Sequence, residues 1–185
     1  MSTQEQKWNL EQLKEFYRNA SYAFTSYDDP MRDYLTRRIS RYGMKSVFEF
    51  GCGMGKNLVV LKGKMPKLIC YGIDLNAAAV DYGHRKFGLD LHEGDEITLS
   101  KMPSEAFDMC ITCSVLNHLP EDITHTIVGH LKRICIKYIL ILENNDGENA
   151  RWFTHDYKSL GFRWMDSMIN RKLRKYDVWE YEKPQ

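Results

Sequence analysis

The sequence has almost no excess charge and no long apolar run. Among its 185 residues, 26 Lys and Arg stand against 25 Asp and Glu, which gives a formal net charge of +1. Proteins that attract nucleic acid through their overall field usually carry a basic face or a clear positive excess. The chain also lacks an apolar stretch of membrane length and a signal peptide. We therefore expect a cytoplasmic protein without a membrane partner, and nucleic acid is a disfavoured partner.

Internal repeats, linkers and low-complexity tracts are missing as well. A chain of 185 residues fits one domain, and at this size about two-thirds of the surface is buried on folding. We predict a single domain over residues 1–185. Two helical patterns in residues 1–45 are expected to form a cap, and residues 46–182 are expected to form the core.

The chain also lacks the residue spacing of a metal site. Cys110 and Cys113 form a C-x-x-C, but both fall in one strand-like run, where an odd separation points the thiols to opposite faces. His125 and His130 lie about 140° apart around a helix, so they do not form an i, i+4 pair. We expect no metal, and we expect all five cysteines to be reduced structural thiols in a reducing compartment: Cys52, Cys70, Cys110, Cys113 and Cys135.

What the sequence does contain is a mostly apolar run that stops at alternating glycines. Val47–Phe50 is followed by Gly51, Gly53 and Gly55. This pattern is typical of a buried parallel strand that turns sharply into a helix and leaves room for a ligand against bare backbone. The first amide groups of such a helix have no partners inside it and point at the loop. The stretch therefore predicts a cofactor site.

The spacing of these glycines distinguishes two cofactor families. The dinucleotide fingerprint G-x-G-x-x-G requires a glycine where this chain has Lys56. Glu49 to Gly55 instead reads acidic-x-Gly-x-Gly-x-Gly, which resembles the first motif of class I S-adenosylmethionine-dependent methyltransferases of the small-molecule, type 11/12-like group. The resemblance implies S-adenosyl-L-methionine as cofactor and S-adenosyl-L-homocysteine as product. It also implies that Glu49 positions the methionine end of the cofactor, above a loop that includes Cys52.

A second strand-like run ends in a carboxylate, Asp74, about twenty residues beyond the glycines. One helix and one strand fill that distance, so Asp74 is expected beside the glycine loop, where it can accept both ribose hydroxyls of an adenosine. Capping of the next helix is a compatible role for Asp74, and Asn76 is an alternative cap. The neighbouring Leu75 is a further candidate for contact with the cofactor.

A third strand-like run, Leu89–Asp95, ends in Gly-Asp. In the methyltransferase family, an acidic side chain at this place accepts a hydrogen bond from the adenine amino group. The resemblance makes Asp95 the candidate, with Glu96 beside it. Acidic residues of an ordinary surface turn would look the same, so both interpretations stay open.

The fourth strand, Phe107–Cys113, is followed by a stretch that resembles the post-strand motif of small-molecule methyltransferases. Ser114–Pro120 holds a histidine before Leu-Pro and a helix. The resemblance implies a cofactor contact from Ser114 and a methyl acceptor near His118. An imidazole with a pKa of about 6.5 can act as a base at neutral pH, so His118 is the catalytic candidate. The structural alternative is that His118 caps the helix or packs under a lid.

An aromatic segment, Tyr17–Tyr27, precedes the first strand. One interpretation is that its rings cover an exposed sheet edge. The other is a lid over the active site, because segments at this place in the methyltransferase family often are lids and aromatic faces suit a sulfonium cation.

Strand–helix alternation from Val47 to Leu142 predicts an α/β, doubly wound, mostly parallel sheet. Arg151–Phe162 resembles a short helix of the family that ends in Gly-Phe. Two strand-like runs on either side of residues 170–174 then predict a C-terminal antiparallel hairpin. The resemblance over residues 46–182 implies seven strands in a Rossmann-like methyltransferase fold.

The function that the sequence favours is methyl transfer to an oxygen, nitrogen or carbon of a small molecule, and three alternatives stay open. Enzymes of this fold that methylate base amines usually carry Asn/Asp-Pro-Pro-aromatic after the fourth strand, where this chain has Cys113–Leu116. Basic residues near the hairpin suit a solvated tip or a phosphate-bearing substrate such as RNA. A nicotinamide-dependent oxidoreductase would need the glycine that Lys56 replaces and a Tyr-x-x-x-Lys pair. A non-catalytic module that binds S-adenosylmethionine would keep every binding motif.

Overall fold

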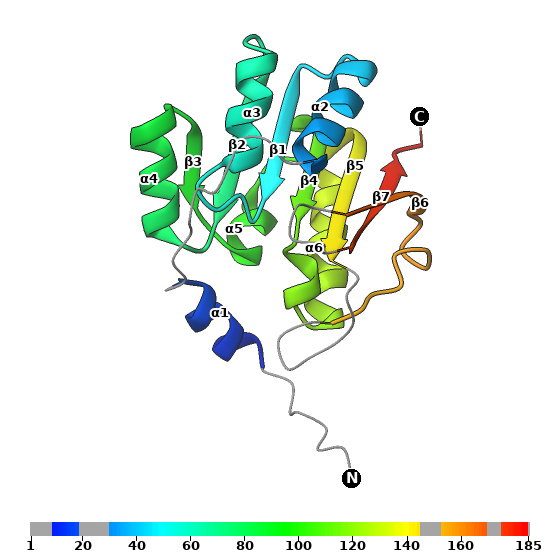
Figure 1. The fold of residues 1–185 in the computed structure, drawn as a ribbon. Coiled ribbons are helices and arrows are strands. Elements are labelled where there is room, and N and C mark those ends of the chain that lie inside the picture. The colour runs from blue at the N-terminus through cyan, green and yellow to red at the C-terminus, as the bar shows by residue number, and fades with distance from the viewer. Residues whose placement is uncertain (1–8, 19–29, 145–152, 170–174, 185) are drawn as a thin grey trace.

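The computed structural model describes residues 9–18, 30–144, 153–169 and 175–184. These residues form a seven-stranded sheet in the order β3-β2-β1-β4-β5-β7-β6 (Figure 1). The first five strands pair in parallel, whereas β7 runs antiparallel to both β5 and β6, so the predicted doubly wound sheet with a terminal hairpin is confirmed. The strands are β1 (Ser46–Phe50), β2 (Ile69–Asp74), β3 (Asp90–Glu93), β4 (Phe107–Cys113), β5 (Cys135–Asn144), β6 (Arg163–Ile169) and β7 (Lys175–Glu182).

Helices pack on both faces of the sheet because the central strands are apolar on both sides. Along β1, Val47 lies in one core and Phe48 in the other. The first core contains residues of α2, α3 and α4, and the second contains residues of α5 and α6. The helices are α1 (Leu10–Arg18), α2 (Pro30–Tyr42), α3 (Lys56–Lys64), α4 (Ala77–Phe87), α5 (Glu96–Lys101) and α6 (Glu121–Ile134), with a 3-10 turn, η1 (Leu116–His118), after β4.

Local signals set several element boundaries. Asn76 caps α4 by accepting a 2.8 Å hydrogen bond from the Ala79 amide, and Gly88 ends the helix with a φ of 63°. The short helix expected to end at Gly161 is instead a turn within Tyr157–Gly161. The Asp156 carboxylate accepts hydrogen bonds from the amides of Lys158 and Ser159, as an N-cap does. The amides of Gly161 and Phe162 bond back to Lys158 and Tyr157, as at a helix C-terminus, so start and stop signals lie only one turn apart. Gly161 itself has the expected left-handed φ of 78°.

The carboxyl ends of the parallel strands meet at one edge of the sheet, and α1 lies beyond that edge (Figure 1). This arrangement brings an N-terminal helix next to the loops that follow β2, β3 and β4. Across the described ranges, every helix is too short or too polar to span a bilayer.

Candidate active site

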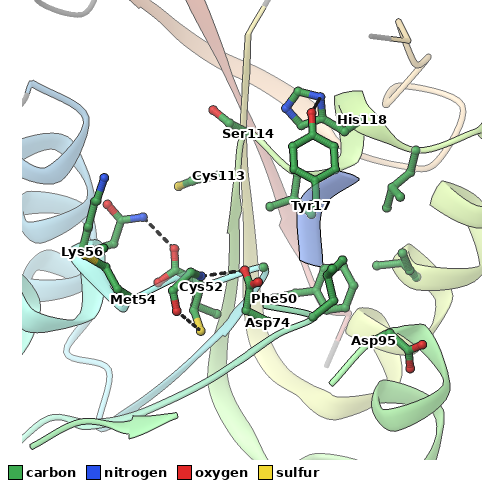
Figure 2. A pocket seen from close by; sticks show the side chains of 18 of the residues that line it. Tyr17, Phe50, Cys52, Met54, Lys56, Asp74, Asp95, Cys113, Ser114 and His118 are labelled. Atoms are coloured by element: carbon green, nitrogen blue, oxygen red, sulfur yellow. Dashed lines mark hydrogen bonds between the residues drawn. The ribbon is translucent and has the colours of Figure 1, made fainter. Parts of the chain in front are cut away.

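A cavity of about 380 Å³ opens at the carboxyl ends of β1, β2 and β4. Its walls are the loops that follow these strands, together with side chains from α1 and α2 (Figure 2). All the residues that the sequence singled out for cofactor binding or catalysis line this cavity, with the exception of Gly55. They are Glu49, Gly51, Cys52, Gly53, Asp74, Leu75, Asp95, Glu96, Ser114 and His118.

The three glycines of the loop take left-handed conformations, with φ of 71° at Gly51, 54° at Gly53 and 77° at Gly55. A Cβ at Gly51 would lie 2.3 Å from Cγ2 of Val115, and one at Gly55 would lie 2.5 Å from Cδ1 of Leu89. Strain and lack of space therefore both exclude side chains at these two positions. Gly55 does not face the cavity, but it is the N-cap residue of α3 and so sets where that helix begins.

Glu49 places a buried carboxylate at the wall of the cavity. Its Oε1 accepts a 2.6 Å hydrogen bond from Nδ2 of Asn57, whereas its Oε2 is buried without a hydrogen-bond partner in the described part of the chain. Burial raises the pKa of Glu49 to about 8, although the Asn57 hydrogen bond and the charge of Arg32 lower it. A buried carboxylate with an unused oxygen is stabilised by a cation. The site therefore fits the ammonium group of a ligand beside Glu49.

Asp74 is held by backbone amides on both of its oxygens. Oδ2 accepts a 2.7 Å hydrogen bond from the Gly53 amide, and Oδ1 accepts a 2.8 Å hydrogen bond from the Asn76 amide. Burial raises the pKa of Asp74 and these two hydrogen bonds oppose the shift. Since each carboxylate oxygen has two lone pairs, both keep one for a ligand hydroxyl. Asp74 thus ties the glycine loop to β2 and still has the capacity to bind a ribose.

The acidic pair after β3 contacts a lysine that the sequence did not single out. Nζ of Lys14, in α1, lies 2.6 Å from Oε1 of Glu96 and 3.1 Å from Oδ2 of Asp95. Burial lowers the pKa of Lys14, but the hydrogen bonds to the two acids outweigh it and raise the pKa. Oδ1 of Asp95 also caps α5 by accepting from two backbone amides. An adenine amino group at Asp95 would therefore share the carboxylate with Lys14.

The loop after β4 is strained at its start and held by a buried acid. Ser114 has a φ of 56°, which is uncommon for a residue with a side chain. Oε1 of Glu143, at the end of β5, accepts hydrogen bonds from the amides of Val115 at 3.3 Å and Leu116 at 3.0 Å. These bonds fix η1, which ends at His118.

His118 meets Tyr17 of α1 at one side of the cavity (Figure 2). Oη of Tyr17 lies 2.7 Å from Nδ1 of His118, and the centroids of the two rings are 4.8 Å apart. The carbonyl of Tyr17 accepts a 3.0 Å hydrogen bond from Nδ2 of Asn76. The helix α1 therefore contacts the loops that follow β2, β3 and β4. Beyond Arg18, the aromatic segment predicted as a lid lies outside the described residues.

Besides Lys14, two further cations at the cavity were not assigned from the sequence. Lys56 follows Gly55 directly, so its position next to the glycine loop could have been recognised. Arg32 also lines the cavity, but it comes from α2, which precedes the loop along the chain. No local pattern places α2 against the loop, because that contact depends on how the helix packs on the sheet.

The cysteines lie as the strand spacing predicts. Cys110 belongs to the second core and Cys113 packs against the first, so the two thiols point to opposite faces of β4. All five cysteines are free. Within the described ranges, no group of three or more His, Cys, Asp or Glu side chains is arranged to hold a metal ion.

Comparison with known proteins gives a family match and a set of similar structures. Residues 47–137 match a family model described as a methyltransferase domain. A comparison with curated protein sequences finds no match. The magnesium protoporphyrin IX methyltransferase from Synechocystis PCC 6803 with bound S-adenosylhomocysteine superimposes with a TM-score of 0.69 at 14% identity, over 94% of each chain.

Two further structures have the same fold. A methyltransferase from Archaeoglobus fulgidus that depends on S-adenosylmethionine has a TM-score of 0.60 at 15% identity, and the match covers 95% of this chain and 100% of that one. A structure from work on the conversion of a disulfide bond into a thioacetal group during echinomycin biosynthesis has a TM-score of 0.67 at 16% identity. That match covers 94% of this chain and 92% of the other.

The fold, the acidic glycine loop and the family match define the class of protein. Residues 47–137 form a methyltransferase domain, and the whole chain has the fold of class I S-adenosylmethionine-dependent methyltransferases. The structures of the Synechocystis enzyme hold S-adenosylhomocysteine and S-adenosylmethionine.

Proposed function

We propose that this enzyme transfers the methyl group of S-adenosylmethionine to an oxygen, nitrogen or carbon atom of a small molecule. The observation that carries the proposal is that one cavity has Glu49 at one wall and the Tyr17–His118 pair at another. The buried acid suits the charged methionine end of the cofactor. The tyrosine–histidine pair suits an acceptor that loses a proton.

The cofactor-binding roles follow from charge and from unused lone pairs. Oε2 of Glu49 accepts from the ammonium group, and the cations Arg32 and Lys56 of the same cavity bind the carboxylate. Asp74 accepts from the ribose hydroxyls through the lone pairs that its amide contacts leave open. Asp95 accepts from the adenine amino group while Lys14 holds it in place.

The reaction mainly requires that the acceptor atom is aligned with the methyl group. The sulfonium supplies a methyl group on an excellent leaving group, so the protein has to hold the nucleophile in line and exclude water. Positioning of this kind contributes about 7–11 kcal/mol. The contacts of α1 with three loops close one side of the cavity and so exclude water there.

His118 removes the proton when the acceptor arrives protonated. In the tautomer whose Nδ1–H donates to Oη of Tyr17, the lone pair of Nε2 is the one that takes the proton. The contact with Tyr17 thereby orients the ring.

Two of the similar structures support a small acceptor. One is named for magnesium protoporphyrin IX, and the other belongs to work on echinomycin biosynthesis. The formal net charge of +1 also gives no general attraction to a polyanion.

A formation assay for S-adenosylhomocysteine tests the proposal. The enzyme is incubated with S-adenosylmethionine and panels of phenols, amines, carboxylic acids and enolisable carbonyl compounds, with RNA and DNA as separate arms. We expect turnover above background with at least one small-molecule class and none with the nucleic acids. Turnover with nucleic acid alone would contradict the proposal.

A further inference from the structure

A second, smaller cavity of about 110 Å³ lies beside η1, and among the described residues none lines both this cavity and the cofactor cavity. Its described walls come from η1, the end of β5, residues 153–157 and β7. Asn117, which lines this cavity, directly precedes His118, which lines the larger one. The small cavity is therefore next to the acceptor end of the active site.

Two nearly buried side chains of this cavity have polar atoms without partners in the described part of the chain. Asn117 is 3% exposed and its Oδ1 accepts no hydrogen bond, while Tyr157 is 4% exposed and its Oη makes none. An unsatisfied buried polar group costs about 1–3 kcal/mol, so each such group calls for an explanation.

His155 adds a third acceptor. Its Nε2 lies 2.9 Å from the carbonyl oxygen of Leu116, which can only accept, so Nε2 carries the proton and Nδ1 has the lone pair. That Nδ1 is buried and has no partner among the described residues. Burial lowers the pKa of His155, and the hydrogen bond to Leu116 only partly opposes this shift. Because the pKa is lowered, the ring is neutral at physiological pH.

Glu143 places a buried carboxyl group at the same cavity, and a bound cation would favour the charged form of that group. It is 4% exposed, and its oxygens accept from three backbone amides, two at Oε1 and one at Oε2. One lone pair of Oε2 remains. Asp177 is a second acid in the wall; the hydroxyl of Ser167 donates to it, and Nζ of Lys175 lies 3.9 Å from its Oδ1. Among the described lining residues there is no Lys or Arg.

Aromatic rings complete the described wall. Phe153, Tyr157 and Trp179 line the cavity, and the rings of Tyr157 and Trp179 lie 5.6 Å apart between centroids. Aromatic faces attract cations, and the attraction grows where water is excluded.

Acceptor atoms, two acids, aromatic rings and no basic side chain in the described wall suit one kind of ligand. We propose that this cavity binds a small organic ammonium group, with Glu143, Asn117, His155 and the hydroxyl of Tyr157 as the hydrogen-bond acceptors around it and Trp179 packing against it. The group belongs either to the methyl acceptor or to a separate small amine. The first possibility rests on the proposed function, whereas binding in the cavity does not.

Methylammonium chloride is the probe, because it is the smallest organic ammonium. It is titrated into the full-length enzyme without cofactor, and tryptophan fluorescence and heat are recorded. Methanol and potassium chloride, at matched concentration and ionic strength, are the controls. We expect a saturable signal with methylammonium alone, and we expect the Trp179→Phe variant to lose the fluorescence change. Equal signals from methanol or potassium, or no saturable heat with methylammonium, would overturn the proposal.

Two variants test whether methylammonium binds in this cavity. Glu143→Gln removes the charge and should weaken methylammonium binding by about tenfold or more. Because this variant also disturbs the amides of η1, Tyr157→Phe is made in parallel. It removes only a hydroxyl without a described partner, so the fold should keep its thermal stability while affinity falls. Tyr181→Phe, two positions beyond Trp179 and outside the cavity, is the matched control. If Tyr157→Phe and Tyr181→Phe bind methylammonium as tightly as the wild type, the ligand lies elsewhere.

The source of the ammonium group is tested with cofactor present. Alkylamines and their alcohol analogues are compared in the S-adenosylhomocysteine assay. Turnover with amines that Tyr157→Phe reduces supports an amino group on the methyl acceptor. Methylammonium binding without amine turnover supports a separate amine and leaves the proposed methyl transfer to be judged on its own panel.

Discussion

At the scale of single residues, Glu49 is the group that the cofactor should change most. Its Oε2 is buried without a partner in the described residues, and burial raises its pKa to about 8. We expect Glu49→Gln to weaken binding of S-adenosylhomocysteine by about tenfold or more, because a charge-assisted hydrogen bond to the ammonium group is lost. Calorimetry is the measurement. Glu93→Gln, at an exposed position at the end of β3, should leave the affinity unchanged. Equal losses in both variants would contradict the role of Glu49.

The tyrosine–histidine pair makes a separate prediction about rate. His118→Ala should lower the turnover number by about 10²–10⁴-fold while cofactor affinity stays nearly intact. Tyr17→Phe keeps the ring but removes the hydroxyl at 2.7 Å from His118, so it should lower turnover less than His118→Ala and shift the pH–rate profile. A fall below threefold in His118→Ala would make His118 structural. Loss of cofactor affinity together with turnover would instead assign it to the cofactor wall.

Residue roles were predictable from the sequence where a role follows from position along the chain. Glu49, the glycines, Asp74 and His118 stand at fixed distances from strand ends, and all but Gly55 line the cavity. The ion pair of Lys14 with Asp95 and Glu96 was not predictable, because it joins residues 81 and 82 positions apart. The cofactor and catalytic roles of the predicted residues stay predictions.

At the scale of elements, α1 is the segment that should respond to the cofactor. Lys14 and Tyr17 tie it to the loops after β3, β2 and β4. We expect hydrogen exchange in Leu10–Arg18 to slow when S-adenosylhomocysteine is added, since the ligand would hold the loops that α1 contacts. Strand β6, none of whose residues is among the described lining residues of the cavity, is the internal control, and its exchange should stay unchanged. Equal protection of α1 with and without ligand would favour a static cover.

Strands were predicted better than the connections between them. The apolar runs of β1, β4 and β5 follow directly from burial on both faces of a parallel sheet. The turn within Tyr157–Gly161 was expected as a helix because Gly161 looks like a helix end. The N-cap bonds at Asp156 and the C-cap bonds at Gly161 lie only one turn apart, and a periodicity argument does not detect how close they are.

At the scale of the whole molecule, two buried acids couple stability to pH. The pKa values of Glu49 and Glu143 both rise to about 8, mainly through burial. Since the unfolded chain releases these protons near pH 4.5 and the folded chain holds them to about pH 8, the folded state binds more protons within that window. The unfolding free energy of the cofactor-free enzyme should therefore fall as pH rises from about 5 to 8.

Urea unfolding at several pH values measures this dependence. Glu49→Gln should flatten the slope, because it removes one of the two acids, whereas Glu93→Gln should leave it as in the wild type. A stability that rises with pH across this window would contradict the assignment of both acids as protonated in the folded state.

The order of the whole sheet, including the antiparallel pair at its end, agrees with the resemblance over residues 46–182. The division into a cap and a core stays a prediction, as does a single domain. The shape of the cavity could not be predicted from the sequence, because α1 and α2 reach the site through packing that no local pattern encodes.

Calorimetric titration of the purified enzyme with S-adenosylhomocysteine and with NAD tests the central claim most directly. Both ligands carry an adenosine, so they separate the methyltransferase loop from a dinucleotide site. We expect saturable binding of S-adenosylhomocysteine in the micromolar range and no heat with NAD. Tight binding of NAD without heat from S-adenosylhomocysteine would contradict it.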